Sequence, residues 1–179
     1  MNVTRMLQVT LLLFGVLCVA GRTIAQVVAV PDAERAAKIY MTAFFHGDLQ
    51  TAASLTHPET LDSIRSSLLG DLAKTNDKTG KPVTPADFGL ELSLDEIHKL
   101  SAEAIYVAML EADHKRYPAM FEAMKQTQVE VLSSQITPDG KAIVRLKIIT
   151  PTRTSTSSQD SGLMLRLSNS QWKVLGNAQ

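Results

Sequence analysis

Cysteine is nearly absent from this sequence, aromatic residues are few, and neither sign of charge is in excess. Cys18 is the one cysteine among 179 residues, aromatic residues make up 5% of the chain, and 18 basic residues balance 18 acidic ones. Balanced charge gives no long-range field for a nucleic acid or for another strongly charged partner. One cysteine excludes an intramolecular disulfide. The apolar content of 45% is ordinary for a globular chain with one domain.

We interpret the first 25 residues as a secretory signal peptide. A short basic start is followed by the apolar run Met6–Ala20. That run has the length of a signal's hydrophobic segment and is shorter than the roughly 20 residues of a membrane span. The triplet Thr23–Ala25 supplies small residues for signal peptidase, so we expect cleavage between Ala25 and Gln26. We therefore expect an exported protein, periplasmic or secreted, with no membrane segment after cleavage.

Cleavage at this site changes the chemistry that the chain offers. Cys18 lies in the removed segment and follows Leu17, whereas a lipid-attachment cysteine follows a small residue, so we do not expect lipidation. Without Arg5 and Arg22 the mature chain keeps 16 basic and 18 acidic residues, a formal charge of −2. A mature domain without cysteine excludes thiol catalysis and thiolate metal sites.

The first half of the mature chain has helical spacing. Asp32 follows a proline and is expected to cap a helix that ends at Gly47, and Asp48 is expected to cap a second, short helix. Thr56 and Glu59 have the spacing of a capping box, which predicts a third helix.

Further along the chain, glycine, proline and capping residues predict where the next loop and helices lie. The segment Thr75–Phe88 contains a glycine and two prolines and is expected to be an exposed loop. Ser93 and Glu96 form a second expected capping box, and Ser101 is expected to start another helix. Tyr117–Pro118 should interrupt that helix, because proline disfavours helical geometry in the residue before it.

After residue 127 the period changes from helical to two, which predicts strands. We expect one hairpin from Val129–Ile136 and Lys141–Thr150, a polar connection at Pro151–Ser161, and a second hairpin from Leu163–Leu167 and Gln171–Leu175. Apolar and basic residues alternate in the second expected strand and predict one solvated face: Ala142, Val144, Leu146 and Ile148 against Lys141, Arg145 and Lys147.

Helices followed by an antiparallel meander predict an α+β fold. We expect one cone-like domain over residues 26–179, in which N-terminal helices at about 32–125 pack on a curved C-terminal antiparallel sheet at about 129–176.

Two short segments resemble the nuclear transport factor 2-like superfamily of cone folds, also called cystatin-like or SnoaL-like. They are the end of the first helix with the turn after it, FFHGDLQTAA at 44–53, and the last expected strand, SQWKVLG at 170–176. The resemblance implies a scaffold that carries a pocket, here in an exported member of unknown function. Enzymes of that superfamily place Asp, His or Tyr in the cone, and no catalytic signature of theirs matches this sequence.

Four residues are candidates for lining such a pocket. Tyr40 and Phe44 lie on the first expected helix, where core packing is the alternative role. His46 lies at the end of that helix and has capping as its alternative role. Trp172, on the last expected strand, serves either as a pocket wall or as a packing anchor of the sheet.

The sequence leaves two function classes open. The preferred one is a non-catalytic module that binds a small apolar ligand, another protein or a second copy of itself. We expect it not to bind nucleic acid. We expect no metal and no cofactor, because the zinc, calcium, phosphate and dinucleotide motifs are absent. The alternative is a cofactor-free isomerase or dehydratase with one acid or base residue in an apolar pocket, drawn from His46, Tyr40 and Asp48. An enclosed cavity with two convergent titratable side chains would favour the enzyme; a closed core with His46 at the surface would oppose it.

Overall fold

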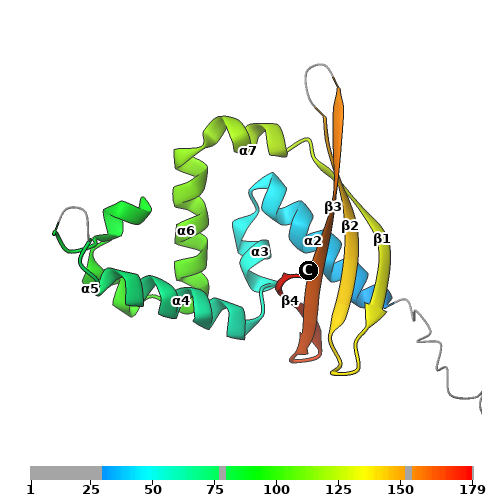
Figure 1. Ribbon diagram of the computed structural model, residues 1–179, viewed down its shortest axis with the longest axis horizontal. Helices are drawn as coiled ribbons and strands as arrows, with labels where there is room; N and C mark the ends of the chain where they lie inside the picture. Colours follow the sequence, from blue (N-terminus) through cyan, green and yellow to red (C-terminus); the bar gives the residue numbers. More distant parts are fainter. Residues whose placement is uncertain (1–29, 77–79, 152–154, 179) are drawn as a thin grey trace, which may run out of the picture.

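Helices precede strands throughout the part of the chain that the computed structural model describes, residues 30–76, 80–151 and 155–178 (Figure 1). The expected signal peptide and its cleavage site lie outside these residues. The helices are α2 (Pro31–His46), α3 (Leu49–Ser54), α4 (Pro58–Leu72), the 3-10 helix η1 (Pro85–Phe88), α5 (Leu94–Lys99), α6 (Ala102–Arg116) and α7 (Pro118–Met124). The strands are β1 (Gln128–Ile136), β2 (Ala142–Pro151), β3 (Thr156–Ser168) and β4 (Gln171–Asn177). The predicted α+β class is confirmed.

The sheet is an antiparallel meander in the order β1-β2-β3-β4. The prediction of a polar connection at Pro151–Ser161 was wrong, because β3 begins at Thr156 and pairs with β2 as far as Pro151. Serine and threonine dominate this part of β3. Its side chains are mostly exposed, so it lacks the apolar alternation on which the strand prediction depended. The strand forms because β2 offers a continuous row of backbone donors and acceptors.

The main core lies between α2 and the inner face of the sheet. The alternation predicted for β2 is confirmed as far as Leu146, since Ala142, Val144 and Leu146 are fully buried and Arg145 is exposed. Lys141, Lys147 and Ile148 are half-buried. We call this cluster the sheet core; its buried members are Ala33, Ala37, Phe45, Val129, Ala142, Val144, Leu146, Leu163, Leu165 and Val174. Small residues at Ala33 and Ala37 allow α2 to approach the strands closely.

Two of the predicted helix caps differ in the structure. Helix α2 begins at Pro31 with Val30 at its cap position, so Asp32 lies in the first turn, because proline is favoured at the first helical position. His57 caps α4, its Nδ1 accepting from the Glu59 amide at 3.3 Å. Thr56 is buried and donates its hydroxyl to the Ala52 carbonyl at 2.9 Å, so it is not available as the cap.

The other predicted start and stop signals are confirmed. Asp48 caps α3, and Ser93 with Glu96 forms a capping box on α5. The Ser101 hydroxyl accepts from the Ala104 amide at the start of α6. The break at Tyr117–Pro118 separates α6 from α7.

The α3–α4 junction covers the β4 edge of the sheet. The Val174 amide donates to the Leu55 carbonyl at 2.7 Å, and the His57 amide donates to the Val174 carbonyl at 2.8 Å. The Thr60 hydroxyl also donates to the Leu175 carbonyl at 2.8 Å. The outward backbone groups of Val174 and the Leu175 carbonyl are therefore paired within the chain, as buried polar groups require.

Helices α4 to α6 with η1 extend away from the sheet as an arm, and α3 lies between this arm and α2 (Figure 1). The arm has its own cluster, which we call the arm core: Leu68, Leu72, Leu90, Ile97, Ile105 and Ala112. A smaller cluster of Leu49, Ala53 and Val107 joins α3 to α6. Among the described residues, every helix is too short or too polar to span a bilayer.

Candidate functional site

The four residues predicted to line a pocket do not gather in one place. Tyr40, Phe44 and Trp172 are half-buried and pack against the sheet core. His46 is exposed at the end of α2 and lines a different, open groove of about 340 Å³ together with Asp48.

The three acid–base candidates, Tyr40, His46 and Asp48, do not lie in one pocket either. Tyr40 faces inward, with its hydroxyl 3.1 Å from the Tyr106 hydroxyl. Burial, and next the neighbouring Tyr106, raise the pKa of Tyr40, so this phenol keeps its proton at neutral pH. Asp48 is held as a helix cap, and hydrogen bonds from the Thr51 hydroxyl and then its amide lower the pKa of Asp48. The space between α2 and the sheet is filled by the sheet core, and His46 lies outside it.

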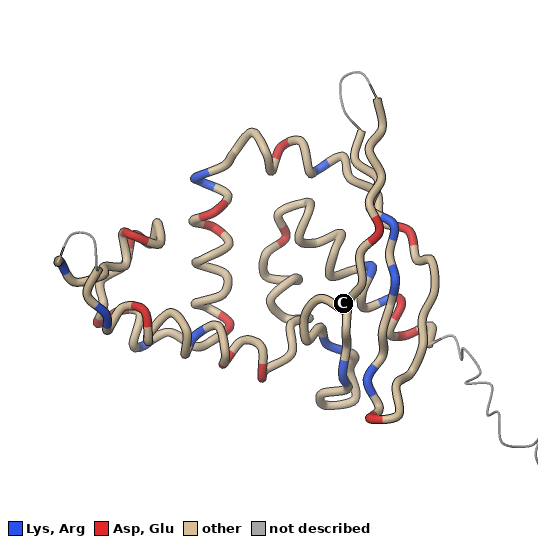
Figure 2. The backbone as a smooth tube through the Cα atoms, viewed as in Figure 1, with Lys and Arg blue, Asp and Glu red and all other residues tan. Residues whose placement is uncertain are grey.

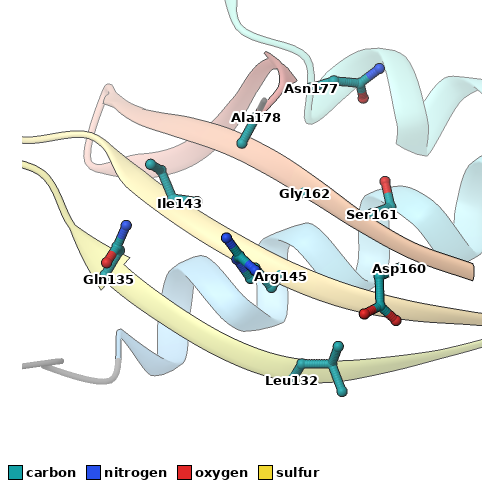
Figure 3. A pocket seen from close by; sticks show the side chains of 9 residues that line it. All are labelled: Leu132, Gln135, Ile143, Arg145, Asp160, Ser161, Gly162, Asn177 and Ala178. Atoms are coloured by element: carbon teal, nitrogen blue, oxygen red, sulfur yellow. The ribbon is translucent and has the colours of Figure 1, made fainter.

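A groove of larger volume lies on the outer face of the sheet, away from α2 (Figure 3). It has a volume of about 470 Å³ and crosses the strands from β1 to the end of the chain. Its lining residues are Leu132, Gln135, Ile143, Arg145, Asp160, Ser161, Gly162, Asn177 and Ala178 (Figure 3). We call it the sheet groove.

Irregularities in the strands shape the sheet groove. Leu132 is the extra residue of a β-bulge in β1, between the pairs Val131–Leu146 and Ser133–Arg145. A bulge sharpens the local twist and redirects a side chain, and here Leu132 is left 49% exposed. A second register shift, between Met164 and Leu165, lies in the pairing of β3 with β4.

The floor of the sheet groove is a glycine. Gly162 pairs with Arg145 across β2 and β3, and the amide of Ala178 donates to the Gly162 carbonyl at 2.9 Å. A Cβ at Gly162 would lie only 3.1 Å from the Cβ and from the carbonyl oxygen of Ala178. The missing side chain therefore allows Ala178 to cross here and leaves the space beside Arg145 open.

Arg145 is the central charge of the sheet groove. It rises from β2 with Asp160 and Leu132 to one side and Ile143 and Gln135 to the other (Figure 3). The guanidinium is exposed and makes no hydrogen bond or salt bridge with the residues described in 30–76, 80–151 and 155–178. Its five N–H donors are therefore open to a partner from outside.

Both signs of charge occur along the sheet and along the helices (Figure 2). On the outer face, Lys147 lies between Glu130 of β1 and Asp160 of β3. None of these three forms a salt bridge within the described ranges. Among the same residues, no group of three or more His, Asp, Glu or Cys side chains is placed to hold a metal ion.

Sequence reasoning identified Arg145 only as part of a solvated strand face. The signal that could have selected it is a lone arginine in an apolar strand that pairs with a glycine-containing strand. That signal requires the register of β2 on β3, which links residues distant in sequence.

Comparisons with protein-family models, with curated proteins and with solved structures give no match. The resemblance to the nuclear transport factor 2-like superfamily therefore stays a prediction.

Proposed function

We propose that the protein is a non-catalytic binding module that holds a carboxylate group of a ligand or partner protein in the sheet groove. The observation that carries this proposal is Arg145, a guanidinium without a partner among the described residues at the centre of a 470 Å³ groove. Export and the superfamily resemblance are consistent with such a module and remain predictions.

The chemistry of the sheet groove favours a carboxylate. A guanidinium is planar and always charged, and its donors match the two oxygens of a carboxylate in a bidentate pair. Leu132 and Ile143 supply apolar surface beside the charge for the rest of the ligand. The volume falls within the roughly 300–1,000 Å³ of small-molecule sites.

The inner face of the sheet supports binding less well. Side chains of the sheet core fill it, and Tyr40 is engaged with Tyr106. The enzyme alternative needed one acid or base residue, drawn from Tyr40, His46 and Asp48, in an enclosed apolar pocket. Tyr40 packs against the sheet core instead, and His46 and Asp48 are exposed in an open groove.

The test is an NMR titration of the labelled protein with butyrate and, separately, with the uncharged butyramide. We expect butyrate to shift the amides of Arg145, Gly162 and Ala178, and butyramide to leave them unchanged. Arg145→Gln should weaken butyrate binding about threefold to fivefold, because an exposed ion pair is worth up to about 1 kcal/mol. Because the site is exposed, added salt should weaken binding as well.

The matched control is Lys173→Gln, which removes a cation from β4 on the same face but outside the sheet groove. It should bind butyrate like the wild type. Equal binding by Arg145→Gln and the wild type, or equal shifts with butyrate and butyramide, would refute the proposal.

A further inference from the structure

Four of the charged residues on the outer face of the sheet lie in two neighbouring rows across β1, β2 and β3. One row is Ser133–Arg145–Gly162, which carries one positive charge. The next row is Glu130–Lys147–Asp160, in which two carboxylates flank one ammonium and leave one net negative charge. A positive row and a negative row therefore lie side by side at the sheet groove.

In the negative row, the Asp160 carboxylate is available to bind a cation. Glu130 and Asp160 both pair with Lys147 across the strands, and neither forms a salt bridge with it or with another described residue. Asp160 is exposed and lines the sheet groove, whereas Glu130 and Lys147 do not line it. A cation that enters the groove beside Arg145 can thus pair with the Asp160 carboxylate. The Lys147 ammonium competes with it for that carboxylate.

The spacing of the rows sets the spacing of the charges in a ligand. Arg145 of β2 and Asp160 of β3 are diagonal neighbours, because Arg145 pairs with Gly162 and Lys147 pairs with Asp160. Diagonal neighbours in an antiparallel pair are about 7–8 Å apart. In a dipeptide with both termini free, the ammonium nitrogen and the carboxylate carbon are about 6 Å apart when the backbone is extended. A single amino acid separates them by only about 2.5 Å, which is too short to serve both rows.

Building on the proposed function, we propose that the sheet groove binds short peptides with two free termini, of about dipeptide length. The C-terminal carboxylate pairs with Arg145, and the N-terminal ammonium lies at Asp160. Leu132 lies in the β1 bulge beside the two rows, and Ile143 lies beyond Arg145 along β2. In this proposal Leu132 and Ile143 contact the apolar side chains of the peptide.

The experiment measures dissociation constants of four probes by NMR titration: Leu-Leu, N-acetyl-Leu-Leu, Leu-Leu amide and leucine. The wild type should bind Leu-Leu about threefold to fivefold more tightly than N-acetyl-Leu-Leu, the range expected for one exposed ion pair. Leucine and Leu-Leu amide should bind more weakly than Leu-Leu. Asp160→Asn should abolish the preference for the free amino terminus and leave the affinity for N-acetyl-Leu-Leu unchanged.

The outcomes separate this inference from the function on which it depends. If the wild type binds Leu-Leu and N-acetyl-Leu-Leu equally, or if Asp160→Asn keeps the preference, the peptide inference is overturned while carboxylate binding stands. If Arg145→Gln binds N-acetyl-Leu-Leu like the wild type, the proposed function fails and the peptide inference fails with it. Lys173→Gln should match the wild type on all four probes, and a preference altered by this variant also overturns the inference.

Discussion

Among single residues, Tyr40 and Tyr106 form one of the contacts that join the sheet to the arm. Their hydroxyls are 3.1 Å apart, one on α2 and the other on α6. A polar group withdrawn from water needs a hydrogen-bond partner, and each of these hydroxyls supplies one for the other. Tyr40, which the sequence suggested as a pocket residue, thus makes a structural contact between α2 and α6.

Removing one hydroxyl should cost more than removing both. Tyr40→Phe leaves the half-buried Tyr106 hydroxyl without this partner, so we expect a loss of about 1–2 kcal/mol in the free energy of unfolding. The double variant Tyr40→Phe/Tyr106→Phe should recover part of that loss. Urea denaturation measures both, with Tyr117→Phe as the control because Tyr117 is 51% exposed. A Tyr40→Phe variant as stable as this control would contradict the structural role.

At the scale of elements, the β1–β2 turn is held by charge. Asp139 forms a salt bridge with Lys141 at 2.7 Å and accepts a hydrogen bond from the Thr137 hydroxyl. The Lys141 ammonium first, and the Thr137 hydroxyl second, lower the pKa of Asp139 to about 2.

This turn should loosen only in strong acid. A carboxylate whose pKa is depressed by folding contributes stability above its unfolded value, about 3.9, and loses that contribution as the pH falls through the folded value. We therefore expect the Asp139 carboxyl to titrate near pH 2 by carbon-13 NMR in the wild type. In Lys141→Gln it should titrate at a higher pH, closer to an ordinary aspartate. Identical titration in the two proteins would contradict the assigned cause.

For the whole molecule, the important feature is the division of the apolar interior. The sheet core joins α2 to the strands, and the arm core joins α4, α5 and α6. The small cluster of Leu49, Ala53 and Val107, the tyrosine pair and two polar contacts of α4 connect the two. These polar contacts are the Thr60–Leu175 hydrogen bond and the Glu59–Arg166 ion pair. We expect the arm to open without the sheet, as a cooperative unit of its own.

Hydrogen exchange can detect this independence. Ile97 is fully buried in the arm core, so Ile97→Ala should lose about 2–5 kcal/mol of local stability. Protection should fall in α4, α5 and α6 and remain in β2 and β3. Val144→Ala in the sheet core is the matched variant and should lower protection in the strands. A uniform loss of protection across the chain with Ile97→Ala would show one cooperative unit instead.

Local signals predicted much of the fold. Asp48, the Ser93–Glu96 capping box and the Tyr117–Pro118 break were predicted because a cap or a proline acts within about four residues of itself. The two caps that were predicted wrongly have different explanations, one from tertiary packing and one from a neighbour in the sequence. Thr56 is withdrawn from its predicted role by burial, and Asp32 is displaced by Pro31 at the helix start.

The sequence alone therefore determined the α+β class, the order of helices and strands, and the solvated face of β2 that carries Arg145. The tertiary structure decided that β3 extends through its polar half, that Arg145 pairs with Gly162, and that the charged rows lie side by side. The physical reason is the range of the interactions. Periodicity and caps depend on neighbours in the chain, whereas register, bulges and an open groove depend on strands that meet only when the sheet forms.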